Sequence, residues 1–145
     1  MSAPDFYFAI QAIFRHLHDC QGKEVLIDYW RALAREYYAD RTASWKAGGL
    51  PAVAADWRSY FDAEPGADVQ VTADDREVVL AINVCPAIKH LRAHHRDIVP
   101  YFCEHCDHIC GMMAEAADLE FRRDGGMGAC CQRFIRRPAP ASETA

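Results

Sequence analysis

The feature that most constrains the fold is a change of hydrophobic period near residue 67. Before it, apolar residues recur every three or four positions, as on one face of an α-helix. After it, Val78, Leu80, Ile82 and Val84 alternate along one stretch, which is typical of a strand with one buried face. A chain with helices first and alternating strands later favours an α+β fold.

The helical half is predicted to cover residues 5–64. Apolar stripes indicate amphipathic helices at 5–19 and 23–40. A third helix is expected from Pro51, because proline suits the first turn of a helix. The stretch 42–49 is ambiguous, because it ends in two glycines that interrupt any helix there.

The second half, 67–136, is predicted to contain two β-hairpins with helices between them. The first hairpin joins strands near 69–71 and 78–84. The second joins 119–123 and 129–136 through a glycine-rich turn. The prediction is therefore α+β, with N-terminal helices followed by a small antiparallel sheet of about four strands and helices inserted between its hairpins.

The 145 residues suffice for one domain with its own core, which we place at 1–137, followed by a disordered tail at 138–145. The formal charge of -5 argues against a nucleic-acid or acidic-membrane partner. The N-terminal residues do not resemble a signal peptide, and no apolar run approaches membrane-spanning length. We therefore expect a cytoplasmic protein with a small-molecule partner; a homodimer stays open.

Reactive side chains concentrate in residues 101–110, which hold three thiols, two imidazoles and two carboxylates. On a helix, Cys103, Cys106, Asp107 and Cys110 share one face, and the two histidines point to the other side. Seven cysteines in a chain without an export signal indicate reduced thiols rather than a disulfide framework.

A soft-metal site is the first interpretation of these thiols. Element ends allow distant ligands to converge, and the four predicted metal ligands all lie at or near such ends: Cys85, Cys103, Cys106 and Cys130. Four thiolates suit tetrahedral zinc and can also suit iron or an iron–sulfur cluster. Asp107 or Cys110 is an alternative for one ligand.

The alternative interpretation is structural. Free cysteine is often buried as a small hydrophobe, which is the expectation for Cys20, Cys110 and Cys131. His105 and His108 are expected at the surface, and the glycines near residue 126 to supply the positive φ of a hairpin turn.

Three short motifs carry a family resemblance, and they lie within 67–136. They are Val84-Cys85-Pro86, Tyr101-Phe102-Cys103 with Asp107 four residues on, and Gly125-Gly126 followed by Cys130. This pattern resembles the signature of the L-2-amino-thiazoline-4-carboxylic acid hydrolase-like family. It is similar, more distantly, to vinyl reductase domains, which are small ligand-binding modules whose cysteine cluster can hold zinc.

The resemblance implies hydrolytic opening of a small cyclic C–N bond, as in a thiazoline. The first hypothesis is therefore a metal-dependent hydrolase near Cys85, Cys103 and Cys130. A thiolate-held zinc ion with an open position lowers the pKa of bound water to about 7. Asp107 or His105 would then act as general base or orient that water.

Two other functions stay open. One is a non-catalytic small-ligand-binding or sensor module with a structural zinc–cysteine site, which four sulfur ligands would favour. The other is a thiol redox or iron–sulfur protein, in which Cys103 and Cys106 at a helix N-terminus have a lowered pKa. No βαβ unit precedes these cysteines, so a thioredoxin-like order is absent from the pattern.

Overall fold

The structure is a computed structural model that describes residues 5–139. The first half contains α1 (Asp5–Gln21), α2 (Lys23–Ala32), a short π-helix η1 (Leu33–Tyr37) and α3 (Ala39–Asp62). The second half contains β1 (Asp68–Ala73), β2 (Glu77–Val84), α4 (Pro86–Ala93), α5 (Glu104–Ala116), β3 (Leu119–Gly126) and β4 (Ala129–Arg136). The predicted α+β order, helices first and helices between two hairpins, is confirmed.

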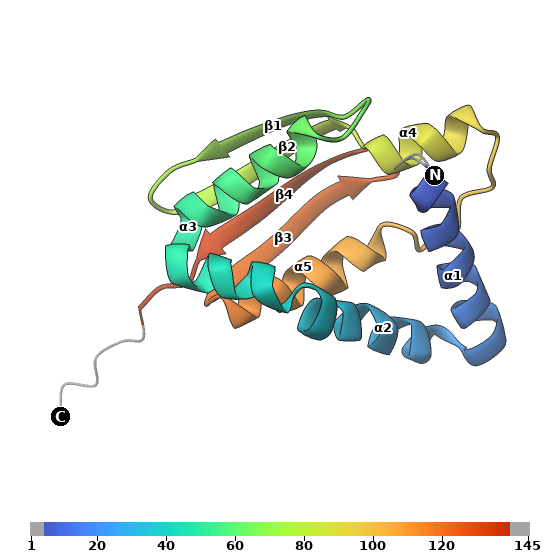
Figure 1. The fold of residues 1–145 in the computed structure, drawn as a ribbon, viewed down its shortest axis with the longest axis horizontal. Coiled ribbons are helices and arrows are strands. Elements are labelled where there is room, and N and C mark those ends of the chain that lie inside the picture. Colours follow the sequence, from blue (N-terminus) through green and yellow to red (C-terminus); the bar gives the residue numbers. More distant parts are fainter. Residues whose placement is uncertain (1–4, 140–145) are drawn as a thin grey trace.

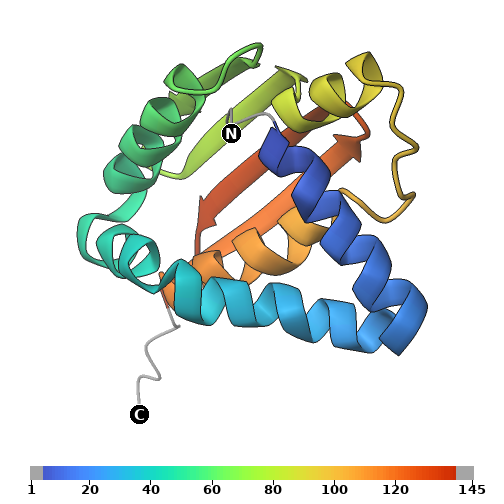
Figure 2. The same ribbon diagram turned by 45° about the vertical axis from the view of Figure 1, so that its right-hand side comes forward.

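The four strands form one antiparallel sheet in the order β1-β2-β4-β3, so the two hairpins lie side by side. The helices lie on one face of this sheet (Figures 1 and 2). Strand β2 explains why, because Val78, Leu80 and Ile82 are buried whereas the alternate Val79 and Ala81 are only half-buried.

Each hairpin turn has a local cause. In the β1–β2 turn, Oδ1 of Asp74 accepts the backbone N–H groups of Arg76 and Glu77, both at 2.8 Å. In the β3–β4 turn, Gly125 has a φ of 87° and Gly128 a φ of 126°, conformations that favour glycine.

The helical half departs from the prediction in two places. The single helix expected at 23–40 ends at Ala32 and continues as the π-helix η1, whose wider turn changes the direction of the following side chains. The ambiguous stretch 42–49 is helical and belongs to α3, which is kinked at Gly49, where φ is 64° and ψ is -154°. Pro51 follows this kink, in the place that the sequence predicted for a helix start.

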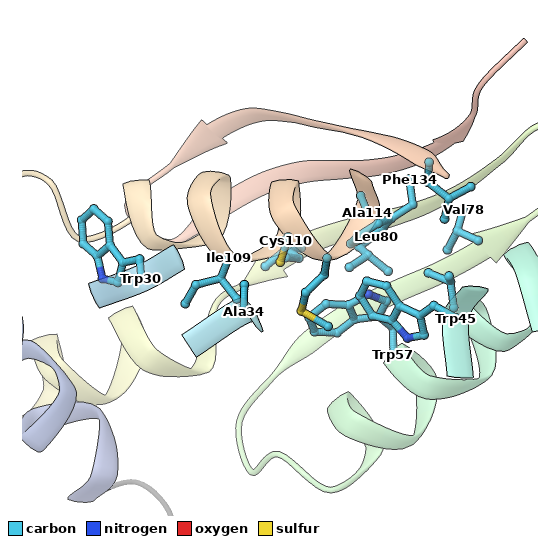
Figure 3. Close-up of a cluster of buried hydrophobic side chains, with 14 of the residues drawn as sticks. Trp30, Ala34, Trp45, Trp57, Val78, Leu80, Ile109, Cys110, Ala114 and Phe134 are labelled. Carbon is cyan, nitrogen blue, oxygen red and sulfur yellow. The ribbon is translucent and has the colours of Figure 1, made fainter. Parts of the chain in front are cut away.

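The core joins the two halves of the chain (Figure 3). Trp45 and Trp57 of α3 pack on Phe134 of β4, with ring centroids 5.2 and 6.0 Å apart. Ile109 and Cys110 of α5 complete this buried cluster. Because each ring buries a large apolar area, these contacts fix α3 and α5 against the sheet.

Two sequence expectations concern the chain ends and the membrane. The predicted disordered tail lies outside the described residues from position 140 onward. Between Asp5 and Ala139, no helix combines the length and the apolar character that crossing a membrane requires.

Candidate functional site

A cavity of about 160 Å³ lies between the N-terminal helices, α5 and the sheet. The helical half contributes an aromatic wall, made of Tyr7, Tyr38, Arg41, Trp57 and Tyr60. The second half contributes a thiol wall, made of Cys85, Cys103, Cys106, Cys110 and Cys130. The cavity therefore lies where the two halves of the chain meet.

The thiol wall forms because three chain segments meet at the β3–β4 turn. The backbone N–H of Cys85, just after β2, donates to the carbonyl of Gly128 at 2.8 Å. Cys130 lies on β4 opposite Ile82. Cys103 precedes α5, and its sulfur accepts the N–H of Met127 at 3.2 Å. Thus the four cysteines predicted as ligands, together with Cys110, line one cavity.

His105 also lines this cavity, contrary to the expectation that it points away from the cysteines toward solvent. The regular helix begins only at Glu104, so a helical wheel drawn from Cys103 places the first residues wrongly. The imidazole packs on Phe14 of α1, with ring centroids 5.4 Å apart. His108 is likewise not free at the surface, because it stacks on Trp30.

His105 and Cys106 form a hydrogen-bonded pair. The sulfur of Cys106 lies 3.5 Å from Nε2 of His105, and Nδ1 of the same ring contacts the carbonyl oxygen of Phe102. In the neutral tautomer, Nδ1–H donates to that carbonyl and Nε2 accepts from the thiol. This is the geometry of a thiol with an adjacent oriented base.

Asp107 is engaged by an arginine behind the thiol wall. Arg123 donates from Nε to Oδ1 of Asp107 at 2.8 Å and from Nη2 to Oδ2 at 2.7 Å. Its Nη1 donates to the carbonyl of Gly125. Arg123 lines the cavity, whereas Asp107 is not among the lining residues. The carboxylate therefore fastens α5 to the β3–β4 turn, and its predicted role as a base has no support from this geometry.

A metal site at the thiol wall depends on how the possible donor side chains are arranged. Within residues 5–139, no group of three or more His, Cys, Asp and Glu side chains is placed to hold one metal ion. Asp107, the predicted alternative ligand, is already bound by Arg123. Metal binding at these cysteines therefore stays a prediction from sequence.

Burial keeps the thiol wall uncharged. It raises the pKa of Cys106 and of Cys130 to about 11, and that of Cys110 well above its ordinary value. Burial also raises the pKa of Cys103, although the Met127 N–H opposes this effect by stabilising the thiolate. Burial lowers the pKa of His105. At neutral pH the sulfurs therefore act as soft apolar groups.

Aromatic rings surround Arg41, the cation of the aromatic wall. The Cζ atom of Arg41 lies within 4.4 to 5.9 Å of four ring centroids, those of Tyr38, Trp45, Trp57 and Tyr60. Nε of Arg41 donates to Oδ2 of Asp56, which also accepts Nε1–H of Trp45 at 2.6 Å. The charge of Arg41 is thus balanced on one edge of the guanidinium.

Two donors of the aromatic wall are unpaired. Nη2 of Arg41 and Nε1 of Trp57 are both buried and have no hydrogen-bond partner among the described residues. An unpaired buried donor costs about 1–3 kcal/mol. The sequence pattern did not single out Arg41, although its position four residues before Trp45 places a cation on an apolar helix face.

The tyrosines of this wall are held in their neutral form. The hydroxyl of Tyr7 donates to Glu64 at 2.6 Å, which ties α1 to the end of α3. Burial raises the pKa of Tyr60 to about 12 and raises those of Tyr7 and Tyr38.

Comparisons with known proteins add nothing to the description of this site. No protein-family model, no curated protein and no solved structure matches the chain. The resemblance to the thiazoline hydrolase-like family therefore stays a prediction from the short motifs.

Proposed function

We propose that this protein binds a small, mostly apolar organic molecule in the cavity between its two halves. The observation that carries the proposal is a partly open cavity of about 160 Å³, lined mostly by aromatic rings and uncharged thiols. An apolar protein cavity of about this size holds a ligand as large as benzene. Pockets of this composition are typical of small-molecule sites.

The proposal is tested by filling the cavity from one side of β4. Cys130 lines the cavity, whereas the neighbouring Cys131 projects from the opposite face of the sheet. In Cys130→Phe the ring occupies the space, and binding of ethylbenzene, measured by ligand-detected NMR, is expected to disappear. The matched variant Cys131→Phe is expected to keep it. If the unmodified protein binds ethylbenzene, equal binding by both variants contradicts the proposal. A protein that binds neither ethylbenzene nor a polar aromatic molecule of the same size contradicts it as well.

Hydrolysis of a cyclic C–N bond is a second candidate, supported by the Cys106–His105 pair rather than by a metal. The thiol proton would pass to Nε2 of His105 while sulfur bonds to the electrophilic carbon, and the C=N electron pair would move onto nitrogen. Nε2 would return the proton to that nitrogen. A water molecule would then replace the nitrogen on the same carbon, with its hydroxyl bonding to carbon and its proton passing to nitrogen as the C–N bond breaks. Cleavage of the C–S bond, with transfer of the hydroxyl proton to sulfur, would leave a carbonyl product and the thiol.

Energetics rank this candidate below binding. Burial raises the pKa of the Cys106 thiol to about 11 and lowers the pKa of the His105 imidazole, so both shifts oppose transfer of the proton from sulfur to nitrogen before a ligand enters. A hydrolase requires Cys106→Ser to lower turnover of a thiazoline by about a hundredfold or more. Unchanged turnover in that variant removes Cys106 as the nucleophile.

A further inference from the structure

We propose that the ligand is electrically neutral and presents an oxygen acceptor to the aromatic wall, where Nη2 of Arg41 and Nε1 of Trp57 hold it. This inference rests on the proposed binding function and names the chemical class of the ligand. It depends on three observations, which are the two unpaired donors, the balance of charge around the cavity, and the packing of Arg41 against the rings of the aromatic wall.

The unpaired groups define what the ligand must supply. Among the described residues that line the cavity, the buried side-chain nitrogen and oxygen atoms without a partner are Nη2 of Arg41 and Nε1 of Trp57. Both are donors only, because neither a guanidinium nor an indole accepts a hydrogen bond. Trp57 is 8% exposed, so bulk water has little access to it. A ligand that satisfies them needs an acceptor such as a carbonyl oxygen.

Charge balance favours a neutral acceptor over a carboxylate. Arg41 and Arg123 are the only arginine, lysine, aspartate or glutamate side chains among the described residues lining the cavity. Each already has a carboxylate partner, Asp56 for the first and Asp107 for the second. A bound anion would add an unbalanced charge in a poorly hydrated space, which is costly.

The aromatic wall holds the Arg41 guanidinium in one orientation before the ligand binds. The Arg41 guanidinium lies 4.4 Å from the Trp57 ring centroid and is fixed at its other edge by Asp56. Because Nη2 has almost no accessible surface, the side chains packed on it have to shift locally to admit an acceptor. In these surroundings each hydrogen bond is stronger than at a wet surface.

Three probes of similar size test the inference by calorimetry at pH 7.5. Acetophenone is neutral with one carbonyl acceptor, ethylbenzene has no acceptor, and benzoate carries a charge. We expect acetophenone to bind about tenfold or more tightly than ethylbenzene, since one hydrogen bond to a charged donor accounts for at least that factor. Benzoate is expected to bind more weakly than acetophenone, because its charge would be unbalanced in the cavity.

The outcomes separate this inference from the proposed function. If ethylbenzene binds as tightly as acetophenone, the cavity function stands and the acceptor requirement is wrong. If benzoate binds more tightly than acetophenone, the neutral class is wrong. If none of the three binds, both the inference and the binding function are wrong.

Matched variants locate the donors. Trp57→Phe keeps one aromatic ring but removes the pyrrole ring with its Nε1–H, and it is expected to lower acetophenone affinity several-fold relative to ethylbenzene affinity. Trp30→Phe is the control, because its Nε1 is also buried and unpaired but the residue does not line the cavity. Equal acetophenone affinities in the two variants would overturn the assignment of Trp57.

Arg41→Lys keeps a cation beside Asp56 but removes the second terminal nitrogen, and it is expected to abolish the preference for acetophenone over ethylbenzene. Arg58→Lys, an exposed position on the same helix, is expected to leave this preference intact. Loss of the preference in both variants, or in neither, contradicts a role for Nη2 of Arg41.

Discussion

Two arginines reach the cavity, and the chain uses them in different ways. Their side chains are about equally buried, with 21% exposure for Arg41 and 15% for Arg123. Arg123 satisfies Asp107 with two nitrogens and the Gly125 carbonyl with the third. Arg41 satisfies Asp56 through Nε and leaves Nη2 unpaired. Equal burial therefore does not imply an equal role, because of these two arginines only Arg41 has a buried terminal nitrogen that makes no hydrogen bond.

The largest expected effect of this difference is on stability at Arg123. Arg123→Ala leaves the Asp107 carboxylate and the Gly125 carbonyl without their donors, so we expect the free energy of unfolding to fall by about 2–3 kcal/mol. Urea unfolding measures this loss. The neighbouring Arg122→Ala removes an exposed pair with Glu120 and is expected to cost less than about 0.5 kcal/mol. Similar losses in the two variants would break the comparison.

Lysine at each position sharpens the comparison. Arg123→Lys loses the two-pronged contact with Asp107, and a cost of about 1–2 kcal/mol is expected. Arg41→Lys is expected to cost less, about 1 kcal/mol at most, because its lost Nη2 made no bond in the protein. Thermal and urea unfolding of both variants decide the order. A larger loss at Arg41 would indicate that its guanidinium is structural.

The smallest expected effect is the response of His105, beside the thiol wall, to acid. Burial lowers the pKa of His105, whose ring faces Phe14, Phe102 and Cys106, with Asp107 and Arg123 nearby. The unfolded chain then binds more protons, so stability contributed by neutral His105 is complete above about pH 6.5 and falls as the pH decreases. In His105→Gln, the free energy of unfolding is expected to depend less on pH between pH 7 and pH 5. The control His95→Gln, at an exposed position, should keep the slope.

Some of this architecture followed from sequence because periodicity reports burial directly. The alternation at Val78, Leu80 and Ile82 identified β2, and cysteines at element ends were found at a common cavity. The π-helix was not predicted and the stretch before Gly49 was ambiguous, because both depend on tertiary packing that overrides local propensity. Function stays less determined, since thiols converge for packing as well as for metals.

Arg41 was missed for a similar reason. Its charge predicts solvent exposure in any linear pattern, and only the fold brings Tyr38, Trp57 and Tyr60 around it. The opposite error concerned Asp107, where spacing along one helix suggested a shared cavity with Cys103. Arg123, from a strand further along the chain, determines where that carboxylate points instead.

The central claim is that the cavity holds a neutral ligand whose oxygen meets Arg41 and Trp57. A crystal structure of the protein soaked with acetophenone tests it most directly. We predict density for the ring between the aromatic and thiol walls, with the carbonyl oxygen within hydrogen-bonding distance of Nη2 of Arg41 and Nε1 of Trp57. A cavity without the ligand under conditions where calorimetry shows binding, or a carbonyl turned toward the thiols, would contradict it.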